Sequence, residues 1–175
     1  MIAVADTGPL LYLSLIDQVG LLPQIFEKVL VPQAVADELS HPATPAKASA
    51  LIENCPAWVE ICYVPKIDSS SSHLDKGEQQ AIMLALSTRG AVLLTDDAEA
   101  RNLATLTANI AASGTIGLLY EAAKNDRIPF TATNFEECMN QLLATNFHRS
   151  RSLLKTIETL SRELHDTRRM SGHAP

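Results

Sequence analysis

The fold is decided by the stretch Leu74-Asp75-Lys76-Gly77-Glu78-Gln79-Gln80-Ala81-Ile82-Met83-Leu84-Ala85-Leu86 and by the segment after it, Gly90-Ala91-Val92-Leu93-Leu94-Thr95-Asp96-Asp97. The first stretch predicts an amphipathic helix, because its apolar residues recur at three-to-four-residue spacing. Asp75 can cap this helix, and Glu78 stands three residues later, as in a capping box. Gly90 is expected to end the helix, and the next residues predict a short buried parallel strand that ends in two adjacent acids. Ligands gather at the carboxyl ends of strands in open α/β sheets, so these acids are candidates for a binding cleft.

Strands and helices alternate along the rest of the chain in the same way. We expect strands at 2–5, 29–31 and 58–64 and a short strand or turn at 109–112; we expect further helices at 9–19, 21–26, 32–39, 46–53, 98–106, 116–124, 135–145 and 152–164. This alternation predicts a three-layer α/β/α fold with a central, mainly parallel sheet. Residues 1–150 form the domain in this interpretation, and residues 151–175 are its C-terminal helix and frayed tail. The serine-rich segment 65–73 is expected to be a mobile loop.

Composition favours a folded globular protein, since 46% of the residues are apolar and only 19% are charged. The net charge of −6 does not favour nucleic acid as a partner, because phosphate binding normally needs a basic surface. The segment from Phe147 onward differs, with six basic and three acidic side chains. Its basic residues are candidate contacts for an RNA backbone, but a solvated helix face is the favoured interpretation, and His148 is expected at the surface.

The cysteines and the N-terminus carry no signal for a metal, a disulfide or a membrane. Cys55, Cys62 and Cys138 follow no metal-binding or disulfide spacing, so we expect reduced thiols. No run approaches the roughly 20 apolar residues that a membrane span needs, and no basic segment precedes the N-terminal apolar stretch. We therefore expect a cytoplasmic protein without membrane contact.

Four acids lie where local structure alone does not demand them: Asp6, Glu38, Glu78 and Asp97. Each has an ordinary explanation as a helix N-cap, a capping-box member or a solvated helix residue. If all four share one pocket, their mutual repulsion raises their pKa values and destabilises the fold, unless cations neutralise them. Mg²⁺ or Mn²⁺, held by carboxylates and water, would supply that neutralisation.

A metal site of this kind can activate a water and stabilise the leaving oxygen in phosphodiester cleavage. Asp75 and Asp96 adjoin two of the four acids and are candidate outer-shell or alternative ligands. Thr7 and Thr115 stand at expected helix starts, where their hydroxyls can hold a water or a phosphate oxygen.

Five motifs in the chain resemble those of PIN domains, in particular the VapC-like subgroup with LDxGE and DD…R signatures. They are the opening Val4-Ala5-Asp6-Thr7-Gly8-Pro9-Leu10, the segment Val31-Pro32…Val35…Glu38-Leu39, Leu74-Asp75-x-Gly77-Glu78-x-x-Ala81-Ile82, Leu94-Thr95-Asp96-Asp97…Arg101, and Gly114-Thr115-Ile116-Gly117-Leu118-Leu119. The motifs occur in the right order, and the resemblance runs from about residue 2 to 150.

The resemblance implies a metal-dependent ribonuclease that cleaves single-stranded RNA, commonly the toxin of a toxin–antitoxin pair. It implies Mg²⁺ or Mn²⁺ as cofactor, RNA as substrate, an antitoxin protein as partner and a homodimer. The family's acidic quartet falls on Asp6, Glu38, Glu78 and Asp97, which would be both metal-binding and catalytic, with Asp96 as a further metal ligand. Glu78 departs from the simpler pattern, since many members have Asp there and Glu reaches one methylene further.

Two other classes of function are open to the same residues. The first is a catalytically inert PIN-like module that binds RNA or a protein. The second is aspartyl-phosphate chemistry, which is disfavoured because residue 8 is Gly and the acid pair Asp96-Asp97 follows a later strand.

Overall fold

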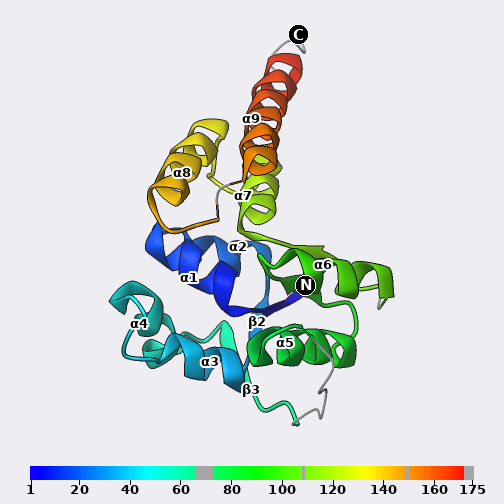
Figure 1. The fold of residues 1–175 in the computed structure, drawn as a ribbon. Coiled ribbons are helices and arrows are strands. Elements are labelled where there is room, and N and C mark those ends of the chain that lie inside the picture. The colour runs from blue at the N-terminus through cyan, green and yellow to red at the C-terminus, as the bar shows by residue number, and fades with distance from the viewer. Residues whose placement is uncertain (66–72, 108, 149, 172–175) are drawn as a thin grey trace. The chain divides into compact units, whose positions relative to one another are not determined.

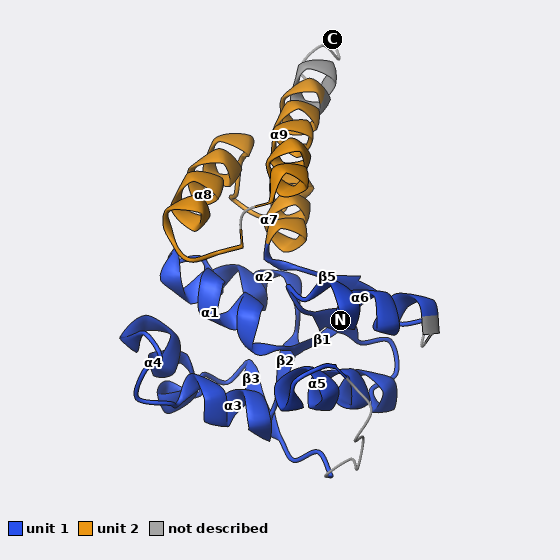
Figure 2. Ribbon diagram, in the orientation of Figure 1, with its two compact units in different colours: residues 1–115 blue, residues 116–175 orange. Residues whose placement is uncertain are grey.

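The computed structural model describes residues 1–65, 73–107, 109–148 and 150–171. The chain divides into two compact units, residues 1–115 and residues 116–175 (Figure 2). Unit 1 holds the sheet and all the acids singled out above, and unit 2 is helical. The mobile loop expected at 65–73 and the frayed tail lie mostly outside the described residues, as does Arg149.

Five strands in the described part of unit 1 form one parallel sheet in the order β3-β2-β1-β4-β5. Their bounds are Ile2–Ala5 for β1, Lys28–Pro32 for β2, Val59–Cys62 for β3, Val92–Leu94 for β4 and Ala112–Ser113 for β5. The central strand is β1, where Val4 lies opposite Leu30 on one side and Leu93 on the other. All the strand pairs are parallel, so all the carboxyl ends lie at one edge of the sheet.

Helices of unit 1 cover both faces of this sheet, which makes the fold a three-layer α/β/α fold. Their bounds are Thr7–Leu15 for α1, Leu22–Ile25 for α2, Gln33–Leu39 for α3, Ala46–Asn54 for α4, Lys76–Ser87 for α5 and Ala98–Asn102 for α6, with short turns η1 at Val19–Leu21 and η2 at Leu103–Thr107. The chain steps from β1 to β2 and β3 in one direction and returns across β1 to β4 and β5 in the other. Because parallel crossovers are right-handed, this reversal sends the connecting helices to opposite faces.

The central helix α5 and its neighbour α6 bury one side of the sheet. Their small apolar residues pack against β1 and β4 in a cluster that contains Val4, Leu74, Ala81, Ile82, Ala85, Ala91, Leu93, Ala100 and Ala104. Helix α5 also lies beside α3 (Figure 1). The contact between α3 and α5 is important for the site, because each of these helices carries one of the candidate acids.

Several boundaries differ from the sequence-based expectation. The helix expected at 9–19 covers Thr7–Leu15, the helix expected at 135–145 covers Ala132–Ala144, the helix expected at 152–164 covers Arg151–Ser171, and the strand expected at 58–64 covers Val59–Cys62. Helix α5 ends at Ser87 rather than at Gly90, which instead forms a turn with φ of 72°. Strand β5 lies at 112–113 rather than 109–112, because its pairing is set by the edge of β4, where Leu93 N donates to Ala111 O. The helix expected at 98–106 widens after Asn102 into one π-helical turn.

Unit 2 contains α7 from Thr115 (the last residue of unit 1) to Lys124, α8 at Ala132–Ala144 and α9 at Arg151–Ser171. Thr131 and Asn134 form a capping box at the start of α8. The ring of Phe135 is fully buried and packs edge to face with the ring of Tyr120, at a centroid distance of 6.3 Å. The Tyr120 hydroxyl donates to Glu163 Oε2 at 2.7 Å, and this bond raises the pKa of Tyr120 to about 12.

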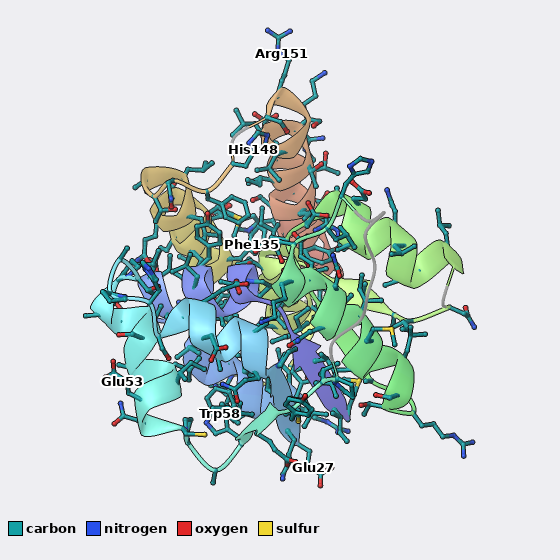
Figure 3. The ribbon with its side chains drawn as sticks, turned by 60° about the horizontal axis from the view of Figure 1, so that its bottom comes forward. Glu27, Glu53, Trp58, Phe135, His148 and Arg151 are labelled. Atoms are coloured by element: carbon teal, nitrogen blue, oxygen red, sulfur yellow. The ribbon has the colours of Figure 1, made fainter. Side chains whose placement is uncertain are left out.

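The basic residues of the C-terminal segment are exposed where their side chains are described. Arg151, Lys155 and Arg162 face solvent on α9, and His148 is exposed as well (Figure 3). The three cysteines are free thiols, as expected. Within the described residues, we find no helix with the length and apolar character needed to cross a bilayer.

Candidate functional site

The sheet topology gathers the candidate acids at the carboxyl edge of unit 1. Asp6 follows the central strand β1, and Asp97 follows its neighbour β4. Glu38 lies on α3, which begins directly after β2. The strand order reverses between β1 and β4, and such switch points are where open α/β sheets bind ligands.

Asp6 is the most buried of these acids, with 6% of its surface exposed. Its carboxylate accepts from Thr7 N at 2.7 Å, which caps α1, and from the hydroxyl of Thr95 at 3.0 Å. Burial raises the pKa of Asp6 to about 7 in spite of these two hydrogen bonds, and the charges of Asp75 and Glu78 add to the increase. A cation bound beside this carboxylate would favour its ionised form.

Asp97 is connected to Asp6 through one buried side chain. Asp97 Oδ1 accepts from Ala100 N at 2.7 Å and so caps α6. The Asp97 amide donates to Thr95 Oγ1 at 3.2 Å, and the same hydroxyl donates to Asp6. Sequence reasoning missed Thr95, although a polar residue between an apolar strand and an acid pair is a signal that could have indicated it.

Glu78 forms the expected capping box and also lies among the acids. Glu78 N donates to Asp75 Oδ1 at 2.8 Å, and Asp75 N donates to Glu78 Oε2 at 2.9 Å. Burial is the main cause of the raised pKa of Glu78, and the charges of Asp75, Asp97 and Glu38 raise it further. Glu78 is therefore a capping-box residue and remains a candidate metal ligand as well.

Glu38 is half-buried rather than a solvated helix residue. Its Oε2 accepts from the Thr7 hydroxyl at 2.5 Å, although 31 positions separate the two residues. Its carboxylate lies against Gly77, where a Cβ would come within 2.9 Å of Oε1. The glycine of the LDxGE motif thus leaves room for an acid from another helix, a role that the sequence alone did not indicate.

A buried amide holds α3 and α5 together beside these two acids. Gln80, on α5, accepts with its side-chain oxygen from Ala34 N at 3.1 Å. The N-cap of α3 is Pro32, which offers no side-chain hydrogen bond. Gln80 therefore supplies the cap from the neighbouring helix, and the sequence did not indicate this contact either.

The carboxylate of Asp96 binds Thr115, the first residue of α7. Its Oδ1 accepts from Thr115 N at 2.7 Å, and its Oδ2 accepts from Thr115 Oγ1 at 2.6 Å. Burial raises the pKa of Asp96, while both bonds from Thr115 and the charge of Arg101 oppose the increase. The structure thus brings Asp6, Glu38, Glu78 and Asp97 together with Thr7, whereas Asp96 and Thr115 form a second cluster next to them.

The acids fit a hydrated divalent ion in their chemistry but do not form a ready-made cage. Among the described residues, no three His, Cys, Asp or Glu side chains are grouped closely enough to hold one ion. Glu38 Oε1, Glu78 Oε1 and Asp97 Oδ2 take no hydrogen bond from another described residue. Mg²⁺ usually keeps several waters and uses only one or two carboxylates, so a hard ion can be held by these oxygens and by water.

One family model, described as PIN domain, matches residues 2–163. The match begins in β1 and ends in α9, so it includes every acid described above. No curated protein matches the sequence.

Proposed function

Because this chain belongs to the PIN-domain family, we propose that it is a metal-dependent endoribonuclease that cleaves phosphodiester bonds in single-stranded RNA. PIN domains are generally nucleases, and the family supports a nuclease-type activity. The observation that carries the proposal is electrostatic: the pKa of Asp6 is raised to about 7, and the charges of three other acids act on Glu78. Acids that raise one another's pKa in a cleft are typical of functional sites.

Asp6, Glu38, Glu78 and Asp97 would hold Mg²⁺ or Mn²⁺, directly or through water. When bound, the ion would lower the pKa of a water and stabilise the charge on the leaving oxygen. Thr7 would orient Glu38 through its hydroxyl, and Thr95 would keep the carboxylate of Asp6 at a fixed position relative to Asp97. Metal binding requires ionised carboxylates, so the cation and a proton would compete for Asp6 and for Glu78.

The biological role extends this proposal and rests on the resemblance of the motifs alone. We propose a toxin of a toxin–antitoxin pair that forms a homodimer and has an antitoxin protein as partner. The rival candidate is an inert PIN-like module that binds RNA or a protein. The raised pKa values of Asp6 and Glu78 favour the enzyme, because a module that only binds RNA has no need for clustered acids.

The test is cleavage of single-stranded RNA with Mn²⁺ by the full chain, with and without EDTA. We expect activity only with Mn²⁺, and we expect Asp6→Asn and Asp97→Asn to abolish it. Glu53→Gln is the matched control, since Glu53 is an exposed acid on α4 and loses the same charge (Figure 3). Activity in EDTA, or full activity in Asp6→Asn, would eliminate the metal mechanism. RNA binding without cleavage would favour the inert module.

A further inference from the structure

We propose that Asp96 is a positioning residue that holds the metal-site acids in place, and that it does not bind the metal itself. The proposal rests on the proposed function for the site that Asp96 positions. The two adjacent acids Asp96 and Asp97 differ in the hydrogen bonds that their carboxylates accept. Asp97 has one carboxylate oxygen that takes no hydrogen bond from the residues that the structure describes, whereas both oxygens of Asp96 accept hydrogen bonds from Thr115 at 2.6–2.7 Å.

The Asp96 carboxylate is also enclosed by two glycines from different loops. A Cβ on Gly114 would come within 2.7 Å of Asp96 Oδ1, and a Cβ on Gly8 would come within 3.2 Å of Oδ2. Backbone therefore lies against both oxygens, in addition to the bonds from Thr115, which is itself fully buried. A hydrated ion would need space that the chain occupies here. Thr115 accordingly serves to hold Asp96 rather than a water or a phosphate.

Asp96 can act on the site because it lies between two residues that the site uses. On its N-terminal side, the hydroxyl of Thr95 donates to Asp6 and accepts from the amide of Asp97. The carbonyl of Thr95 accepts from Arg101 Nη1 at 2.9 Å. The bonds from Thr115 to Asp96 and from Arg101 to the Thr95 carbonyl hold the turn after β4 in its observed geometry. That geometry sets the separation of Asp6 and Asp97.

A titration with Mn²⁺ distinguishes a metal ligand from a positioning residue. Bound Mn²⁺ is measured as the loss of the free-ion signal in electron paramagnetic resonance. Asp96→Asn keeps a matching shape: its oxygen can accept from Thr115 N, and its amide can donate to Thr115 Oγ1. We expect the Mn²⁺ dissociation constant of Asp96→Asn to stay within about threefold of wild type, whereas Asp96→Ala weakens binding about 10–100-fold, as is usual for partners of metal ligands. Asp97→Asn should weaken it more than Asp96→Ala. If Asp96→Asn loses Mn²⁺ as completely as Asp97→Asn, Asp96 is a ligand and the proposal is overturned.

Amide hydrogen exchange of the metal-free protein gives a second readout that does not depend on the nuclease proposal. Losing the Asp96–Thr115 bonds should loosen the turn, so we expect faster exchange at Thr115 N–H and Asp97 N–H in Asp96→Ala but not in Asp96→Asn. Gly114→Ala should behave like Asp96→Ala, and Gly20→Ala is its control, because nothing lies within 4 Å of a Cβ there. Unchanged exchange at Asp97 in Asp96→Ala would overturn the positioning role. If wild type binds no Mn²⁺, the metal mechanism fails and this exchange result still decides the role of Asp96.

Discussion

Gly77 lies directly against the carboxylate of Glu38, so that a Cβ on Gly77 would come within 2.9 Å of Oε1 and 3.3 Å of Oε2. Gly77 belongs to the first turn of α5 and has no side chain, so Glu38 on α3 can approach the end of α5 that also carries Glu78. The contact explains why a motif that looks like a helix start needs glycine at this position.

Gly77→Ala tests this relationship. Alanine favours a helix over glycine by up to about 1 kcal/mol, so the free energy of unfolding should not fall greatly. The new methyl group must push the flexible Glu38 side chain aside, and we expect kcat/KM for RNA with Mn²⁺ to fall at least about tenfold. Gly20→Ala should retain full activity. Full activity in Gly77→Ala would show that the position of Glu38 does not matter.

Two substitutions at Thr95 separate the role of its hydroxyl from that of its methyl group. Thr95→Val keeps the shape but leaves Asp6 Oδ2 and Asp97 N without this partner, whereas Thr95→Ser keeps the hydroxyl. A buried polar group without a partner costs about 1–3 kcal/mol, so we expect urea denaturation to show a loss of that order for Thr95→Val. RNA cleavage should fall in Thr95→Val and largely persist in Thr95→Ser. Equal behaviour of the two variants would contradict the bridging role.

The stability of the metal-free protein should depend on the ionisation of Asp6. The pKa of Asp6 is about 7 in the fold, against 3.8 for an unperturbed side chain. The folded state therefore keeps a proton that the unfolded state releases, and the contribution of Asp6 to stability is lost as the pH rises from about 4 to 7, at about 1.4 kcal/mol per unit of pKa difference. Urea denaturation in EDTA at pH 5 and pH 8 measures this loss.

Asp6→Asn supplies the control for that experiment, because it keeps the side-chain shape and removes the titration. We expect a smaller fall in stability between pH 5 and pH 8 in this variant than in wild type. Mn²⁺ should stabilise wild type at pH 8 and have much less effect on Asp6→Asn, since a ligand that binds the folded state raises its stability. An identical pH dependence in both proteins would mean that Asp6 ionises normally in the fold.

The thiols should differ in reactivity in the native state. Cys138 lies in α8 with 2% of its surface exposed, and burial raises its pKa to about 11. Cys55 is exposed at the end of α4. We expect a thiol reagent at neutral pH to modify Cys55 rapidly and Cys138 only after unfolding, because the thiolate is the reactive form. Peptide mass spectrometry can distinguish the two sites, with Cys55→Ser as the control.

Much of this architecture could be predicted from short stretches of the sequence. The central helix, its capping box and the short strands before Asp6 and Asp96 are patterns of neighbouring residues, and the structure has them within a few positions of the expected bounds. The parallel sheet followed from strands alternating with helices, and the family match agrees with the resemblance to PIN domains. The ends of α5 and β5 were less predictable, since packing and strand pairing set them.

The sequence by itself determined which acids stand at strand ends and helix starts, because caps and apolar periodicity act over three or four residues. Only the tertiary structure decided that Gly77 makes room for Glu38 and that Thr95 bridges Asp6 to Asp97. It also decided that both carboxylate oxygens of Asp96 accept hydrogen bonds from Thr115. These relationships join segments that meet only when the strands pair and the helices pack, and no local pattern encodes the direction in which a side chain then points.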